Sequence, residues 1–197
     1  MFRRDLVAAA AMLPLVAVAG RAFAQEAAPK PADAKAGPAN PTMGEAEMTH
    51  DENTGMIGSL SLLQSRMAAT MASDKKVKMF AMWEVAEQET IGDILKSMKM
   101  DMGKAQGALS PPTDEEAMAM IDKDGKAELD SLQGMSGGDF DAAYVTANLD
   151  GHRKLLKIQE DYLTVGTNRE HLSVAKLARG MINEHIAHLE ELQSMMG

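Results

Sequence analysis

The chain has 197 residues, with 29 acidic and 20 basic side chains, a formal net charge of −9 and no cysteine. An acidic protein is a poor ligand for nucleic acid and for anionic lipid, so neither is a predicted partner. The absence of cysteine excludes disulfides and lipid-modified cysteine, and nothing in the sequence specifies an oligomeric state.

The first 24 residues have the features of an export signal. Arg3 and Arg4 give a basic start, and an apolar run over 6–20 is too short to span a bilayer comfortably. Ala22-Phe23-Ala24 is a small-x-small cleavage sequence, so the mature chain would begin at Gln25. The arginine pair resembles a twin-arginine address, and both that route and the general secretory route stay open. We therefore expect a periplasmic protein without a transmembrane segment in its mature chain.

Residues 25–54 differ in composition from the rest of the mature chain. They are rich in Ala, Pro, Lys and Glu, include four prolines between positions 29 and 41, and show no apolar periodicity. Such a composition predicts a disordered tether, because it offers too little apolar surface to bury. The folded domain is accordingly expected over 55–197.

The folded domain is predicted to be all helical. Apolar residues recur at spacings of three and four, and no run alternates with period two over the length of a strand. In chain order, four long helices are expected over about 56–71, over 75–100, over 140–165 with Asp139 as the N-cap, and from about 169 to the C-terminus with Leu177 among the inward-facing residues.

The connections between these helices predict the topology. Helices two and three are separated by nearly forty residues, in which Thr113 to Glu116 form a capping box that opens a short helix, interrupted at Gly125 and ended by Gly134. The other two connections are tight, so each outer pair should form an antiparallel hairpin. Two antiparallel hairpins joined by a long crossover that contains a short helix are typical of a ferritin-like four-helix bundle.

Polar side chains occupy the middle of three of the apolar stripes. They are Glu84 and Glu87 on helix two, His152 on helix three, and His185 and His188 on helix four. Carboxylates and imidazoles rarely enter a helical core unless they are paired, hydrogen-bonded or bound to a metal. The sequence therefore predicts a buried polar centre, in which oxygen and imidazole ligands would suit Fe, Mn or Zn.

Two interpretations of this polar centre stay open. In the first, carboxylates and imidazoles pair without a metal, and three amides complete a buried network: Gln88, Asn148 and Gln159. In the second, the five Glu and His side chains hold one divalent metal ion. A di-iron oxidase is not expected, because helix one offers only Gln64 and no Glu-x-x-His motif lies on an inner face.

Methionine is the second unusual feature, with 18 residues in the chain. Met98, Met100 and Met102 recur at every second position and resemble the thioether clusters that hold Cu(I). Core filling is the alternative explanation, because a flexible thioether fills gaps in a chain whose aromatic content is only 4%.

Five stretches carry a resemblance to a known family. In chain order they are Val77-Lys78-Met79-Phe80-Ala81, Glu84-x-x-Glu87-Gln88, Gly138-Asp139-Phe140-Asp141-x-x-Tyr144-Val145, Gly151-His152-x-x-Leu155-Leu156-x-Ile158-Gln159-x-x-Tyr162-Leu163 and Ile182-x-x-His185-x-x-His188-Leu189. Over about residues 55–195 the chain resembles the bacterial exported family called domain of unknown function 4142, whose members are often labelled outer membrane proteins. The resemblance implies a ferritin-like, periplasmic protein with no assigned biochemical role. Gln88 lies near the place of a histidine in the commoner family pattern.

These observations favour an exported, ferritin-like protein that acts without catalysis as a binding or envelope-stress module. No nucleophile elbow, phosphate loop or dinucleotide fingerprint indicates an enzyme. The main alternative is a metal-binding protein that uses Glu84, Glu87, His152, His185 and His188, with a divalent metal as its cofactor. Copper handling through the methionines is the third hypothesis.

Overall fold

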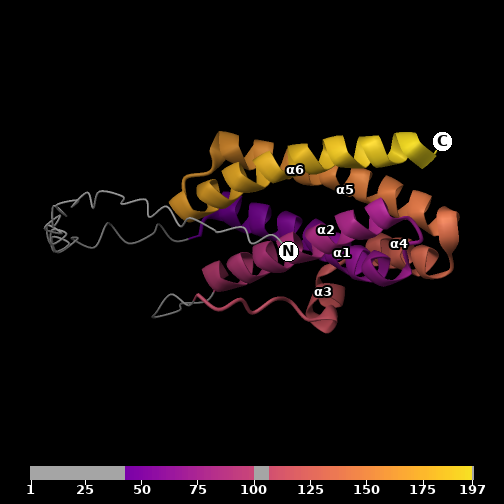
Figure 1. The fold of residues 1–197 in the computed structure, drawn as a ribbon. Helices are drawn as coiled ribbons and strands as arrows, with labels where there is room; N and C mark the ends of the chain where they lie inside the picture. Colours follow the sequence, from indigo (N-terminus) through magenta and orange to yellow (C-terminus); the bar gives the residue numbers. More distant parts are fainter. Residues whose placement is uncertain (1–42, 100–106, 197) are drawn as a thin grey trace, which may run out of the picture. The chain divides into compact units, whose positions relative to one another are not determined.

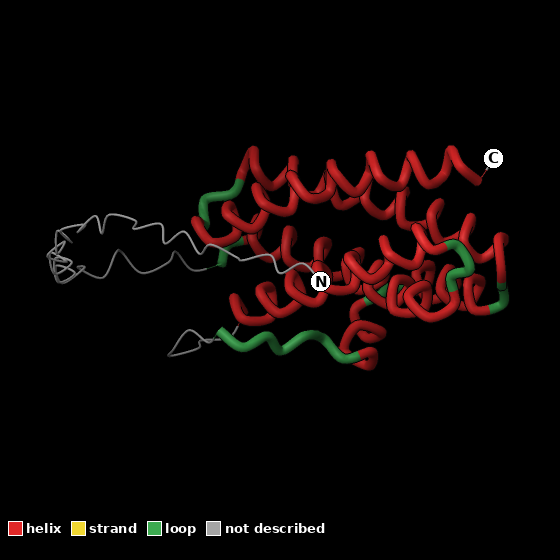
Figure 2. Tube along the Cα trace, in the orientation of Figure 1, coloured by secondary structure: helices red, strands yellow, loops and turns green. Residues whose placement is uncertain are grey.

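The computed structural model describes residues 43–99 and 107–196. In these two ranges every regular element is a helix, which confirms the all-helical prediction (Figure 2). In chain order the helices are α1 Glu45–Met71, α2 Lys75–Lys99, α3 Asp114–Met120, α4 Lys123–Gln133, α5 Gly137–Val165 and α6 Arg169–Met196 (Figure 1). The predicted export signal, the first part of the predicted tether, Met100 and Met102 lie outside the described residues.

Helix α1 begins at Glu45, well before the boundary that the sequence suggested. The prediction of a tether that extends to residue 54 is therefore wrong for residues 45–54. The prolines that favour disorder end at residue 41, and four buried side chains come after them at helical spacing: Glu47, His50, Asp51 and Thr54. All four are polar, so a search for apolar periodicity misses them.

The four long helices pack as two hairpins. Helix α1 packs against α2 across a short turn, α5 packs against α6 across another, and α1 also packs against α5 (Figure 1). Helices α2 and α5 run in the same direction, because Phe80 contacts Tyr144 and Glu84 contacts His152 in the same order along both helices. None of the described helices is both long and apolar enough to cross a bilayer.

In its described part, from residue 107 on, the connection between α2 and α5 contains two short helices rather than one. Helix α3 begins with the predicted capping box, in which Thr113 Oγ1 accepts from the Glu116 amide at 3.2 Å and Glu116 Oε2 accepts from the Thr113 amide at 2.9 Å. The break comes at Ile121 and Asp122, where the Asp122 carboxylate accepts from the Gly125 amide at 2.8 Å and caps α4. The predicted interruption at Gly125 is therefore wrong, because this glycine lies inside α4.

Two further details differ from the sequence prediction. Helix α5 begins at Gly137 after the N-cap Ser136, so Asp139 lies inside the first turn and is not the cap. Gly137 has a φ of 61°, a left-handed conformation that glycine adopts without strain. Leu177 is 70% exposed on α6, whereas its neighbour Ala178 is the residue that faces inward.

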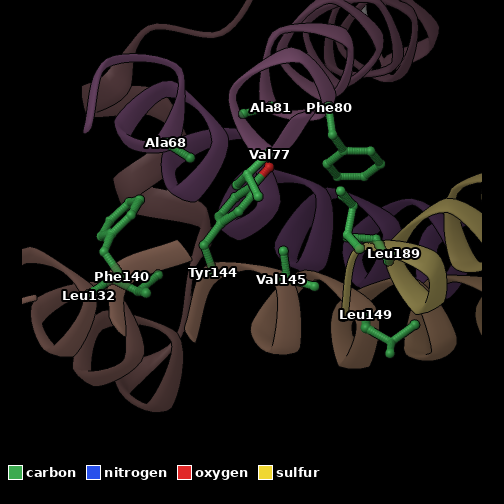
Figure 3. Close-up of a cluster of buried hydrophobic side chains, with 11 residues drawn as sticks. Ala68, Val77, Phe80, Ala81, Leu132, Phe140, Tyr144, Val145, Leu149 and Leu189 are labelled. Atoms are coloured by element: carbon green, nitrogen blue, oxygen red, sulfur yellow. The ribbon is translucent and has the colours of Figure 1, made fainter. Parts of the chain in front are cut away.

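The largest apolar cluster lies at the end of the domain where α1 meets α2 and α6 ends. Its members are Ala68, Val77, Phe80, Ala81, Leu132, Phe140, Tyr144, Val145, Leu149, Leu189 and Leu192. Phe80 of α2 points toward Leu189 of α6 within it (Figure 3). Each large buried side chain contributes about 1.5–3 kcal/mol of transfer free energy. One turn further along α2 this core gives way to Glu84, so the apolar cluster fixes the helices on which the polar centre lies.

The early start of α1 predicts that a fragment beginning at residue 43 is more stable than one beginning at residue 55. The shorter fragment loses the contacts of Glu47, His50 and Thr54 and exposes the partners that these side chains cover. We expect thermal unfolding, followed by circular dichroism, to show a clearly lower Tm for the shorter fragment. Equal Tm values for the two fragments would show that residues 45–54 are not part of the folded domain.

Candidate metal centre

The centre of the site is the carboxylate of Glu84, which is completely buried on α2. Its Oε2 lies 3.2 Å from Nε2 of His152 on α5 and 3.0 Å from Nδ1 of His185 on α6. The two imidazole nitrogens are 3.1 Å from each other. One oxygen and two nitrogens from three helices thus form a nearly equilateral triangle.

The second oxygen of Glu84 is held by hydrogen bonds from two further side chains. Its Oε1 accepts from the Ser61 hydroxyl of α1 at 2.6 Å and from the Gln88 amide at 2.9 Å. Asn148 supports this arrangement, because its Oδ1 lies 2.9 Å from the same hydroxyl and its amide donates to Gln64. These contacts orient the carboxylate and leave Oε2 directed at the two imidazoles.

The tautomer of His152 is determined by one hydrogen bond. Its Nδ1 lies 2.7 Å from the backbone carbonyl oxygen of Asn148, and a carbonyl oxygen can only accept. Nδ1 therefore carries a proton. Nε2 donates to Glu84 when it is protonated as well, and it presents a lone pair to the triangle when it is not. A histidine that binds a metal through one nitrogen is commonly fixed in this way through the other.

His185 lies between two carboxylates. Its Nδ1 faces Glu84, and its Nε2 lies 3.2 Å from Oε2 of Glu87, which is partly exposed. Burial lowers the pKa of His185, but hydrogen bonds to Glu84 and Glu87 outweigh burial and raise the pKa to about 10. In the protein without a metal ion, His185 is thus an imidazolium at neutral pH.

Glu84 is ionised for the complementary reason. Burial alone would raise the pKa of this carboxyl group, but the charges and hydrogen bonds of His152 and His185 hold its pKa well below the usual range. A deeply buried carboxylate that keeps its charge is costly unless it has partners of this kind. Glu84 is therefore a buried carboxylate whose charge is compensated by its imidazole partners.

A small cavity lies beside the triangle, with a volume of about 20 Å³. Its lining includes His152 and His185, the polar side chains of Thr54, Gln88 and Gln159, and several aliphatic groups. A space of this size holds about one water molecule. The Phe80 ring also lies against both imidazoles, with centroid distances of 5.2 Å to His185 and 6.2 Å to His152.

The triangle has the dimensions of a set of metal ligands. Bonds of about 2.0–2.2 Å to nitrogen and oxygen place neighbouring ligands about 2.9–3.6 Å apart, depending on the coordination angle. The three separations here are 3.0, 3.1 and 3.2 Å. Among the described residues, Glu84, His152 and His185 are the group of His, Asp and Glu side chains able to hold one ion.

The structure brings together most of the residues that the sequence singled out, with one exception. Glu84, His152 and His185 converge, and Glu87 joins them through His185. His188 does not, because it lies exposed on α6 against Trp83, with ring centroids 5.9 Å apart. Its assignment to the site is wrong: three residues after His185, it has turned away from the core.

The three predicted amides divide between two clusters. Gln88 and Asn148 lie at the centre, as predicted. Gln159 instead bonds to His50 and Thr54 of α1. The copper hypothesis stays a prediction, since Met98 lies half-buried on α2 while Met100 and Met102 are outside the described residues.

The contribution of α1 to the site was not predicted from the sequence. Ser61 gives Glu84 its shortest hydrogen bond, and His50 and Thr54 lie on the same side of the helix at spacings of four and seven. Serine and threonine neither extend nor clearly interrupt an apolar periodicity, so the pattern did not indicate that these residues belong to the site. The helical spacing of these polar residues, taken together with Ser65, was the available clue.

Comparison with protein families gives a match over most of the chain. The family model described as domain of unknown function (DUF4142) matches residues 28–192, which confirms the resemblance seen in the sequence. Comparisons with the curated proteins and with the solved structures give no match.

Removal of one member of the triangle should destabilise the metal-free protein strongly. We expect His152→Ala or Glu84→Ala to cost about 3–5 kcal/mol, because each leaves a buried charged or polar partner without its counterpart. The exposed His188→Ala is the matched control and should change the unfolding free energy by less than about 0.5 kcal/mol. Urea denaturation measures both, and equal effects for His152 and His188 would contradict the described arrangement.

The raised pKa of His185 predicts a dependence of stability on pH. Because the pKa is about 10 in the folded protein and 6.5 in the reference state, this group stabilises the fold fully below pH 6.5. The contribution should be lost progressively as the pH rises from 6.5 to 10. Urea midpoints of the metal-free parent should fall over this range more steeply than those of His185→Gln. Parallel pH profiles would show that His185 does not carry the proton.

Proposed function

The chain belongs to the family described as domain of unknown function (DUF4142), and we propose that it is an exported protein that binds one divalent transition-metal ion. Oε2 of Glu84, Nε2 of His152 and Nδ1 of His185 would be the ligands. The observation that carries this proposal is the triangle of these three atoms, with separations of 3.0–3.2 Å. Separations of this size are those of neighbouring ligands around one ion.

The hydrogen bonds around the triangle also favour a metal. Each ligand is also oriented through the side-chain atom that would not bind the ion. Oε1 of Glu84 is bonded to Ser61 and Gln88. Nδ1 of His152 is bonded to the Asn148 carbonyl, and Nε2 of His185 is bonded to Glu87. Partners of this kind orient ligands and raise their basicity. When an ion binds, the proton on Nδ1 of His185 must leave, while the Nε2 proton stays hydrogen-bonded to Glu87.

The donor set restricts the choice of metal. Two imidazoles and one carboxylate suit Zn, Fe or Mn rather than Cu(I), which prefers thioethers and thiolates. The cavity beside the triangle would admit one water molecule as a further ligand. A space of about 20 Å³ is too small for an organic substrate, and this supports binding of the ion rather than catalysis.

The proposal includes the cellular setting and the class of fold. The basic, apolar and small-residue segments of residues 1–24 support export to the periplasm. Two hairpins joined by a long connection, with α2 and α5 running in the same direction, support a ferritin-like four-helix bundle. Such a protein would meet divalent ions directly outside the inner membrane.

Metal binding is tested by titration of the metal-free protein with Zn²⁺, Mn²⁺ and Fe²⁺ in a calorimeter. We expect one ion per chain for at least one of them, and a chelator should lower the Tm of the loaded parent. The His152→Ala variant should bind none and lose the chelator effect, whereas His188→Ala should behave as the parent. Absence of binding by the parent, or equal loss in both variants, would contradict the proposal.

The same titration should depend on pH. Since a proton on His185 competes with the ion and its pKa is about 10, one proton should be released for each ion bound. The association constant should therefore rise about tenfold per pH unit between pH 6 and 8. A pH-independent constant would mean that His185 is not a ligand.

A further inference from the structure

A second group of buried polar residues lies next to the candidate metal centre. Nε2 of His50 on α1 is 2.8 Å from Oε1 of Gln159 on α5. The Gln159 amide in turn donates to Thr54 Oγ1 at 3.0 Å. Thr54 and Gln159 line the 20 Å³ cavity that also contacts His152 and His185. These three residues, here called the His50 path, therefore end at the metal centre.

His50 has a nitrogen without a partner. Because Gln159 Oε1 can only accept, Nε2 of His50 carries the proton and Nδ1 of the neutral ring holds a lone pair. Among the described residues, nothing donates a hydrogen bond to this buried Nδ1. Burial lowers the pKa of His50, and nearby His171 adds to the effect, so the ring is neutral at neutral pH. The lone pair of this buried nitrogen is therefore free to coordinate a metal ion.

The outer end of the His50 path reaches the surface. His50 lines a groove of about 550 Å³ together with Glu45, Asn53, Asp161 and Tyr162. Tyr162 stacks on the His50 ring with a centroid distance of 4.2 Å and fixes the plane of the imidazole. Asp161 is paired with Lys157 at 2.7 Å, so the unpaired carboxylate in this lining is that of Glu45, which favours the approach of a cation. His50 therefore lines a surface groove and is linked to the internal cavity through its hydrogen bond to Gln159.

We propose that a divalent ion reaches the Glu84–His152–His185 centre from this groove, with Nδ1 of His50 as a transient ligand and the oxygens of Gln159 and Thr54 as the next contacts. An ion cannot enter an apolar core without ligands that replace its water, because desolvation without replacement costs far too much. The His50 path supplies nitrogen and oxygen donors at successive positions. This inference rests on the proposed function.

The test is the rate at which Zn²⁺ loads the metal-free protein, followed by stopped-flow competition with a coloured chelator. A transient ligand stabilises an intermediate and neither end state, so its loss slows loading and release alike. We expect His50→Gln, at a residue outside the lining of the cavity, to slow both rates about tenfold with the Kd for Zn²⁺ unchanged within about twofold. Thr54→Val should slow loading about tenfold. His188→Gln is the control and should load as the parent does.

Several outcomes would overturn the inference. If both variants load at the parent rate, the ion enters elsewhere. If the Kd weakens while the loading rate stays constant, His50 supports the centre itself rather than the route. If His50→Gln does not fold, Thr54→Val decides the question, because it keeps the shape of the side chain and removes only the oxygen. Failure of the parent to bind Zn²⁺ would instead contradict the proposed function.

Discussion

The burial of one carboxylate, that of Glu84, constrains the whole domain. A charge taken out of water costs several kcal/mol unless the protein replaces its solvation. The replacement comes from every long helix: Ser61 of α1, Gln88 of α2, His152 of α5 and His185 of α6. If any of these helices moved along its axis by one turn, about 5.4 Å, the charge would lose a partner. The polar centre therefore specifies the register of the four helices, while the apolar cluster stabilises their packing through burial of apolar surface.

The same geometry links stability to ligand binding. In the metal-free state the charge of the His185 imidazolium balances one of the two carboxylates that it faces, Glu84 and Glu87. In the loaded state the ion would take the lone pair that the Nδ1 proton of His185 occupies. If the proposed ion binds, proton and metal would compete for a single buried position, whereas occupancy of a surface site would have little effect on the stability of the fold. Stability, pH and metal affinity should change together in this protein, and the metal-free state already holds the ligands at the separations that an ion requires.

Much of this arrangement can be predicted from the sequence, and the exceptions have physical causes. The spacing of apolar residues predicted the bounds of α2, α5 and α6 nearly in full. The polar residues that interrupt this spacing, Glu84, His152 and His185, are the ones that lie together in the buried polar centre. His188 was assigned wrongly, because residues three apart share a face only approximately and the stripe on α6 is narrow. The sequence did not reveal the start of α1 or the role of Ser61, because the buried residues of α1 at these positions are polar. Apolar periodicity cannot detect polar side chains whose burial depends on hydrogen-bond partners far along the chain.

The most direct test of the proposed metal centre is the position of a bound ion, located by anomalous diffraction from crystals of the protein loaded with Zn²⁺. We expect a single strong peak about 2.0–2.2 Å from Oε2 of Glu84, Nε2 of His152 and Nδ1 of His185, with Glu87 still bonded to the other nitrogen of His185. A peak at another place, or an ion-free centre in which His185 keeps its proton between the two carboxylates at saturating Zn²⁺, would contradict it.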